Sequence, residues 1–152
     1  MTRAEKAKAY FKEGYACSQA VALAFTDLTD MTEEQVKKAT LGFGGGFGRL
    51  RLVCGAVCGM TMMAGLILSK DENTMDNKLN TYAVIRELCE KFSKETGSVI
   101  CAELLAAASL QVQVGGNPEK RSAEYYKKRP CDELVYLAAE ILENYLIEKE
   151  II

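Results

Sequence analysis

Apolar residues recur three or four positions apart through most of the 152-residue chain, and glycine or proline interrupts this helical pattern at intervals. The spacing predicts helices over residues 2–12, 17–28, 32–42, 53–68, 76–94, 99–113 and 131–149, and residues 121–128 are a candidate for one further short helix. The alternation of Gln111-Val112-Gln113-Val114 is too short to predict a strand. The sequence therefore predicts an all-α fold, a single domain over residues 1–152, built as a compact bundle of six to seven helices.

A glycine-rich loop separates two of the predicted helices. Five of the seven residues in Gly42–Gly48 are glycine, which excludes regular helix; we call this segment the glycine loop. It does not fit G-x-G-x-x-G or a P-loop, so no nucleotide cofactor motif is present. We expect its bare backbone to close over a cofactor or to donate N–H groups to thiolate or sulfide, at Gly44, Gly45 and Gly46. The alternative is a flexible turn between helices.

The absence of histidine removes whole classes of site. Without it there is no Ser-His-Asp triad, no Cys-His dyad and no Cys₂His₂ zinc site. Six cysteines and six methionines remain as soft ligands, so a transition metal held by side chains here would depend on thiolate.

Charge and hydropathy argue against nucleic acid and membrane as partners. Nineteen basic and twenty-one acidic residues give a net charge of −2, and we interpret the basic residues between 120 and 129 as solvated surface. Residues 52–69 carry no charge, but their glycines, cysteines and methionines favour a buried central helix over a membrane span. The charged N-terminus is not typical of a signal peptide. We expect a cytoplasmic protein with reduced thiols.

Four of the six cysteines fall at predicted helix starts: three lie a few residues after a glycine break, and Cys131 follows Pro130. The first turn of a helix offers free N–H groups and a partial positive charge, which favour thiolate over thiol. The alternative is that each cysteine is a small core residue. We call this set the four helix-start cysteines: Cys17, Cys54, Cys101 and Cys131.

The other two cysteines carry a weaker signal. Cys58 lies one helical turn after Cys54, about 5–6 Å away between Cβ atoms, too far for a disulfide but suitable for sharing a metal. Cys89 occupies a core position of its helix. Gly55 and Gly59, also four apart, predict the close approach of another helix.

The run Cys54-Gly55-Ala56-Val57-Cys58-Gly59 matches Cys-Gly-Ala-x-x-Gly, with one cysteine before it and two after it. Over residues 10–147 the chain thereby resembles the C_GCAxxG_C_C family of putative redox-active proteins. The surroundings are similar too: Cys17-Ser18-Gln19-Ala20, the glycine loop, Gly97-Ser98-Val99-Ile100-Cys101 and Cys131-Asp132-Glu133-Leu134. The resemblance implies an all-helical fold and four shared cysteines, which map onto the four helix-start cysteines. Cys58 falls on a variable position of the motif.

Together these features predict a redox-active protein in which the four helix-start cysteines are both the catalytic residues and the metal ligands. Our first hypothesis is that they bind an iron–sulfur cluster or another thiolate-bound metal for electron transfer. The alternatives are a thiol–disulfide oxidoreductase without metal and a soft-metal carrier. We expect convergence of the four sulfur atoms on one site near the glycine loop.

The expected partners are a second copy of the chain and an unidentified redox partner or metal source. Helices rich in alanine and glycine leave shallow faces, no obvious lid covers the glycine loop, and twofold dimers are the commonest oligomers. A homodimer is therefore our expectation.

Overall fold

The computed structural model describes all of residues 1–152 and contains eight α-helices, one 3₁₀ helix and no β-strand. The elements in chain order are α1 (Arg3–Lys12), α2 (Cys17–Leu23), η1 (Thr26–Leu28), α3 (Glu33–Leu41), α4 (Gly55–Leu68), α5 (Met75–Thr96), α6 (Cys101–Ala107), α7 (Ala123–Lys128) and α8 (Cys131–Glu148). The all-α prediction is confirmed. The predicted number of helices is too low, because the short candidate at residues 121–128 forms the separate helix α7, which has six residues.

Local sequence signals set several helix ends. Thr32 caps α3 by accepting a hydrogen bond from the Gln35 N–H, and the Gln35 side chain accepts one from the Thr32 N–H, so the two residues form a capping box. Gly97 ends α5 with a φ of 90°, a left-handed conformation that glycine adopts without strain. The helix α2 is shorter than predicted, because the chain tightens into η1 after Leu23.

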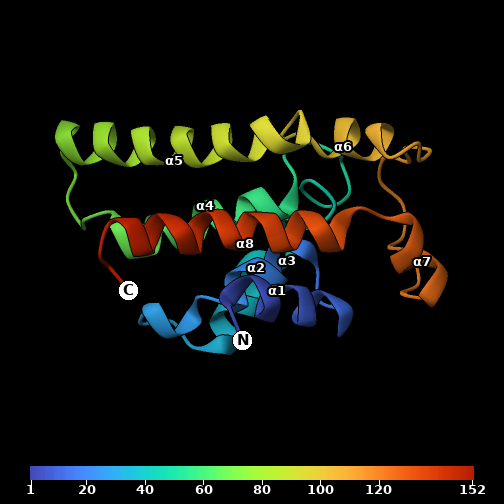
Figure 1. Cartoon of the computed structure of the whole chain (residues 1–152), viewed down its shortest axis with the longest axis horizontal. Helices are drawn as coiled ribbons and strands as arrows, with labels where there is room; N and C mark the ends of the chain where they lie inside the picture. Colours follow the sequence, from blue (N-terminus) through green and yellow to red (C-terminus); the bar gives the residue numbers. More distant parts are fainter.

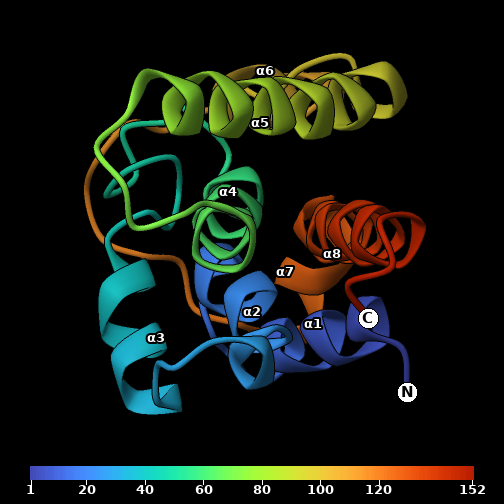
Figure 2. The ribbon, with the colours of Figure 1, turned by 90° about the vertical axis from the view of Figure 1, so that its left-hand side faces the viewer.

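The helices are arranged around α4 and α8, which run side by side through the middle of the molecule (Figures 1 and 2). The long helix α5 covers one side of this pair, and α1, α2 and α3 cover the other (Figure 2). The largest fully buried side chains come from both sides and from the middle: Phe11, Phe25, Met60, Met63 and Phe92. The uncharged run of residues 52–69 therefore supplies the central buried helix, as predicted. No helix has the length and apolar character that crossing a membrane requires.

The predicted helix over residues 99–113 is wrong in its second half. The helix α6 ends at Ala107, and Ser109 then takes a left-handed φ of 60°. The residues that follow are held by the glycine loop and its continuation: Arg51 Nε donates to the Gln113 carbonyl at 2.9 Å, and the Gly115 N–H donates to the Arg49 carbonyl at 2.8 Å. These tertiary hydrogen bonds outweigh the helix propensity of an alanine-rich segment whose Ala106–Ala108 face solvent.

Helices α2 and α4 pack closely at Gly59. A Cβ atom added there would lie 2.6 Å from the Ser18 carbonyl oxygen and 3.2 Å from Val21 Cβ. The prediction that this glycine spacing admits another helix is confirmed, and the helix is α2. Gly65, on the same helix, meets nothing within 4 Å of an added Cβ.

This contrast predicts opposite effects of one substitution at two positions of α4. Gly59→Ala should lower the free energy of unfolding by about 1–3 kcal/mol, because the methyl group collides with backbone that cannot rotate away. Gly65→Ala should raise it by about 0.5–1 kcal/mol, because alanine loses less conformational entropy in a helix. Urea unfolding of both variants checks this, and equal effects would contradict the packing at Gly59.

Candidate functional site

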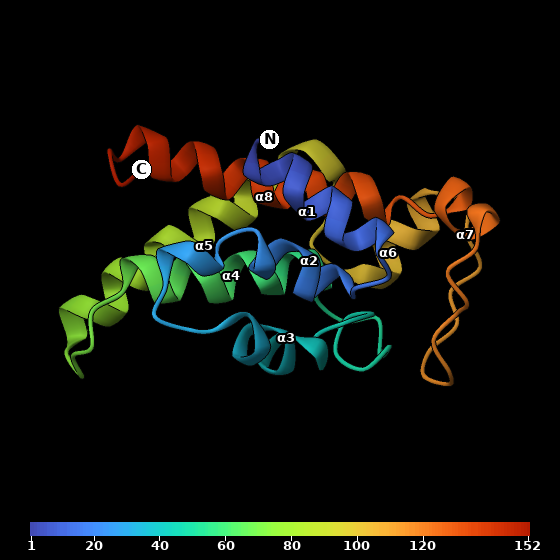
Figure 3. The same ribbon diagram turned by 90° about the horizontal axis from the view of Figure 1, so that it is seen from below.

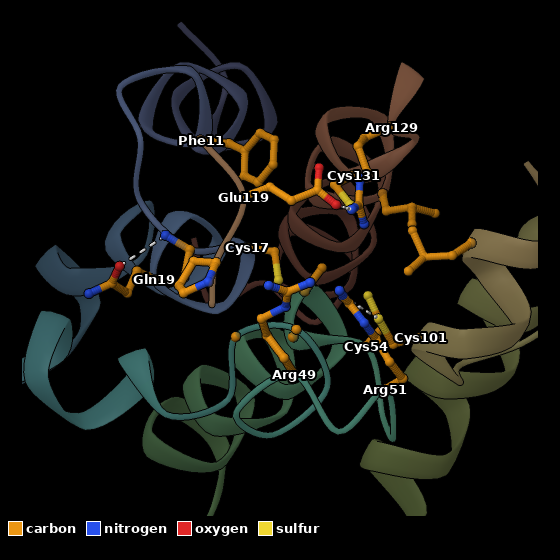
Figure 4. A pocket seen from close by; sticks show the side chains of 18 of the residues that line it. Phe11, Cys17, Gln19, Arg49, Arg51, Cys54, Cys101, Glu119, Arg129 and Cys131 are labelled. Atoms are coloured by element: carbon orange, nitrogen blue, oxygen red, sulfur yellow. Dashed lines mark hydrogen bonds and ion pairs between the residues drawn. The ribbon is translucent and has the colours of Figure 1, made fainter. Parts of the chain in front are cut away.

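The four helix-start cysteines line one cavity of about 470 Å³ at the end of the molecule where the glycine loop, α6 and α7 meet (Figures 1 and 4). Cys17, Cys101 and Cys131 are the first residues of α2, α6 and α8, and Cys54 directly precedes α4. The predicted positions at helix starts are thus confirmed. The structure also brings all four to the wall of the same cavity, and all six cysteines are free thiols.

Backbone pairing places Cys54 beside Cys101. The Cys54 N–H donates to the Val99 carbonyl at 2.7 Å, and the Cys101 N–H donates to the Leu52 carbonyl at 2.6 Å. These bonds flank an isolated antiparallel bridge between Val53 and Ile100. The segments that lead into α4 and α6 are therefore held next to each other, although 47 positions separate the two cysteines.

Glycine makes room for Cys17 at the start of α4. A Cβ atom at Gly55 would overlap the Cys17 sulfur and would lie 3.0 Å from the Phe43 carbonyl oxygen. A side chain here would push α2 away from α4 and separate the thiols. This contact explains why the residue after Cys54 in the motif is glycine.

Burial dominates the protonation of these thiols. It raises the pKa of Cys17, raises that of Cys54 well above its usual range, and raises that of Cys131 to about 12. Backbone N–H groups of Ala56 and Val57 act on Cys54 in the opposite direction, but their effect is smaller. The expectation that helix starts would favour thiolate is therefore wrong for these three cysteines in the metal-free protein.

The charge on each of these thiols affects the pKa of its neighbours. A negative charge on Cys17 raises the pKa of Cys54 and of Cys131, and one on Cys101 raises the pKa of Cys17. A charge on Cys131 also raises the pKa of Cys54, and one on Cys101 raises that of Cys131, so Cys17 and Cys131 each lie within electrostatic reach of the other three. No three or more Cys, Asp or Glu side chains lie close enough together to hold a single metal ion, so the four sulfurs share a cavity wall without meeting at one point. The sulfurs surround the cavity.

The glycine loop lies at the cavity as expected, and its three predicted residues have different places. Gly44 and Gly45 line the wall, and a backbone hydrogen bond from Gly45 lowers the pKa of Cys17 against the larger effect of burial. Gly46 does not line the cavity but packs beside Cys101, whose Cβ would lie 2.9 Å from an added Cβ. Gly45 and Gly46 have φ of 66° and 73°, where a side chain would be strained.

Four arginines that sequence reasoning did not assign to the site also line the cavity: Arg49, Arg51, Arg121 and Arg129. Arg51 is 7% exposed, and its Nη1 donates to Cys101 Sγ at 3.7 Å. Arg121 stacks on the Phe11 ring at 4.2 Å, and Arg129 pairs with Glu119. The interpretation of the whole basic segment 120–129 as solvated surface is therefore wrong for Arg121 and Arg129. Tyr125 and Tyr126, which lie between these basic residues, were the sequence feature that could have indicated their partial burial.

The connection from α6 to α7, residues 108–122, borders the cavity and leaves the helical body as an extended, doubled-back segment (Figure 3). Its residues Gly116, Pro118 and Glu119 line the cavity wall. The segment lies against the continuation of the glycine loop, to which Gln113 and Gly115 are hydrogen-bonded.

The remaining cysteines lie outside the cavity. Cys58 is half-buried, its thiol donates to the Val53 carbonyl at 3.8 Å, and burial raises its pKa to about 11. Cys89 is half-buried and packs against the core, and burial raises its pKa. Neither lines the wall on which the other four meet.

Comparison with known proteins agrees with the motif. Residues 15–145 match the family described as "Putative redox-active protein (C_GCAxxG_C_C)". An "Uncharacterized protein" of Archaeoglobus fulgidus is 28% identical over 162 aligned residues, which cover 99% of each chain. No solved structure matches.

The raised thiol pKa values predict a loss of stability at alkaline pH. In the unfolded chain a cysteine ionises near pH 8.5, whereas folded Cys131 keeps its proton up to about pH 12. Its contribution is complete below the unfolded pKa and is lost as pH rises between these values, at up to about 1.4 kcal/mol per pH unit. Urea unfolding of reduced protein in a chelator should show this decline, and Cys131→Ala should make it shallower. Parallel curves for the two proteins would contradict the burial of Cys131.

Proposed function

This chain belongs to the C_GCAxxG_C_C family of putative redox-active proteins, and from this premise we propose that its four helix-start cysteines form one redox site. The site binds an iron–sulfur cluster or another thiophilic metal for electron transfer. The observation that carries the proposal is that four thiols from four separate helix starts line a single cavity. Cysteine thiolates are the usual ligands of such clusters.

The composition of the cavity suits a thiolate-held group. Its one lining carboxylate, Glu119, is paired with Arg129, so the available soft donors are the sulfurs. The sulfurs are spread around a cavity of about 470 Å³ and do not form a site for a single ion, so a polynuclear group that spans the cavity would suit them better than a lone ion. The bound group would supply the electron-accepting and electron-donating chemistry.

The protein's own residues would hold that group and set its surroundings. Backbone N–H groups act on the sulfurs of Cys17 and Cys54, and Arg51 donates to the sulfur of Cys101. Hydrogen bonds to sulfur and low exposure to solvent are two factors that set the reduction potential of a thiolate-bound cluster. Since the buried thiols are protonated near neutral pH, binding of a metal releases protons, and its affinity should rise with pH.

A second candidate function is that of a thiol–disulfide oxidoreductase. The hydrogen bond from Arg51 to Cys101 Sγ favours it, because a nearby cation stabilises thiolate, the nucleophilic form. The Cys101 thiolate would attack a substrate disulfide, forming a mixed disulfide and releasing one substrate thiolate. A second cavity thiolate would then attack Cys101 sulfur and release the other, so that two electrons pass from the protein to the substrate.

Purification without oxygen separates these functions. A visible absorption band with bound iron and sulfide supports the cluster. Colourless protein with stoichiometric zinc or copper indicates a soft-metal carrier. Colourless, metal-free protein with titratable dithiols that form an internal disulfide indicates the oxidoreductase.

Single substitutions test which cysteines take part. Changing any one of the four helix-start cysteines to alanine should lower bound metal about tenfold or more, because each supplies a ligand. The matched control is Cys89→Ala, which should change the free energy of unfolding by about 1 kcal/mol and leave metal content intact. Metal retained in all four variants, or lost in the control, would overturn the assignment.

A further inference from the structure

The cavity holds more positive charge than its own carboxylate balances. Glu119 is the acidic residue in its wall, and its ion pair with Arg129 neutralises both. Three other guanidinium groups line the same wall without a carboxylate partner: Arg49, Arg51 and Arg121. Unpaired charge in a partly buried site is unfavourable, so this arrangement suits an incoming anion.

Arg49 gives the clearest signal. Its Nη2 atom is buried, and no protein group accepts a hydrogen bond from it. The side chain enters the cavity from the glycine loop and points toward Cys17, with Phe11 and Glu119 on the opposite side (Figure 4). A buried donor without a partner costs free energy, which an oxygen of a bound anion would recover.

Arg51 provides a second guanidinium that is already fixed in place. Its Nε donates to the Gln113 carbonyl at 2.9 Å, and its Nη1 reaches Cys101 Sγ. Arg49 and Arg51 both have left-handed backbones, with φ of 65° and 62°. Such strain at residues other than glycine tends to occur at functional sites. Here it places two arginines of one loop at the same cavity.

Arg121 is held by other means. Its two Nη atoms donate to the carbonyls of Phe11 and Tyr15, each at 3.2 Å, while its plane stacks on the Phe11 ring. It therefore contributes a fixed positive field with both Nη atoms already engaged, whereas Arg51 Nη2 and Arg49 Nη2 have no protein acceptor. Arg49 and Arg51 remain as the contact residues.

Part of the cavity wall is apolar and is formed by Phe11, Leu104, Leu105 and Leu134. A volume of about 470 Å³ lies within the range of roughly 300–1,000 Å³ that is typical of small-molecule sites. It exceeds what an inorganic anion fills. The combination of a cationic end and an apolar wall therefore suits a ligand with an acidic group and a hydrocarbon body.

We propose that the cavity binds a small organic acid, whose oxyanion group is held by Arg49 and Arg51 beside the sulfurs while its body lies against the leucines. As the substrate class of the redox site, this ligand rests on the proposed function. The binding step itself requires only the arginines and the cavity, so it can be measured without metal or electron transfer.

The test is calorimetric titration of the reduced, metal-free full chain at low ionic strength with isovalerate, inorganic phosphate and the uncharged isovaleramide. Isovalerate should bind at least about tenfold more tightly than isovaleramide, because only the acid offers oxygens to the guanidinium groups. Binding of phosphate but not of isovalerate would overturn the organic acid in favour of an inorganic oxyanion. Binding of neither anion would overturn the site altogether.

Substitutions place the ligand within the cavity. Arg49→Gln should weaken isovalerate binding by about tenfold to a hundredfold, because it removes a charge-assisted hydrogen bond. Arg86→Gln, on the exposed face of α5, is the matched control and should change nothing. Unchanged affinity in a folded Arg49→Gln variant would overturn the proposal, and if that variant does not fold, the comparison of acid with amide in the wild-type protein decides. Since every titration is metal-free, failure of metal loading leaves these results unaffected.

Discussion

The close approach of α2 to α4 is the contact on which the site depends. Glycine at positions 55 and 59 removes the side chains that would separate the two helices. The start of α2 can then lie against the start of α4, which puts Cys17 next to the residue that follows Cys54. The same contact encloses the cavity on one side, because most residues of α2 and of the first half of α4 are buried. Helix packing and thiol placement are thus one feature of the fold.

That burial leaves the metal-free site electrostatically incomplete. Three of the four helix-start cysteines have raised pKa values and are neutral thiols at physiological pH, while three guanidinium groups around them lack carboxylate partners. The cavity therefore has a net positive charge. Its thiols become thiolates only when a bound group offsets the free energy cost of burying their negative charge. Metal binding would convert the thiols to thiolates, whose negative charge would offset both the metal and the arginines, and an organic acid would balance the arginines directly. Both proposed occupants reduce an imbalance that the protein alone does not remove.

Much of this arrangement could be predicted from the sequence, because it is encoded locally. Glycine and proline breaks mark the helix starts, and the four helix-start cysteines lie at or a few residues after these breaks. The failures involve long-range effects. Residues 108–113 have helical propensity, but hydrogen bonds to a loop 60 positions away decide their conformation. Arg121 and Arg129 lie in a charged segment of the kind that usually faces solvent. Their partial burial depends on contacts with aromatic rings and with Glu119, and hydrophobic periodicity does not predict such contacts.

The glycine loop joins these two kinds of information. Its glycines are visible in the sequence, yet Phe47, Arg49 and Arg51 also have left-handed backbones, which nothing in their identity predicts. Hydrogen bonds hold them there: the N–H groups of Arg49 and Arg51 donate to the carbonyls of Gly44 and Gly45, at 3.2 and 3.1 Å. A simple flexible turn between α3 and α4 would need neither these bonds nor the strain of three residues that are not glycine. The conformation is explained if the glycine loop and the residues that follow it serve to hold Arg49, Arg51 and backbone N–H groups next to the thiols. Its glycine content then reflects a compact, fixed structure at the site.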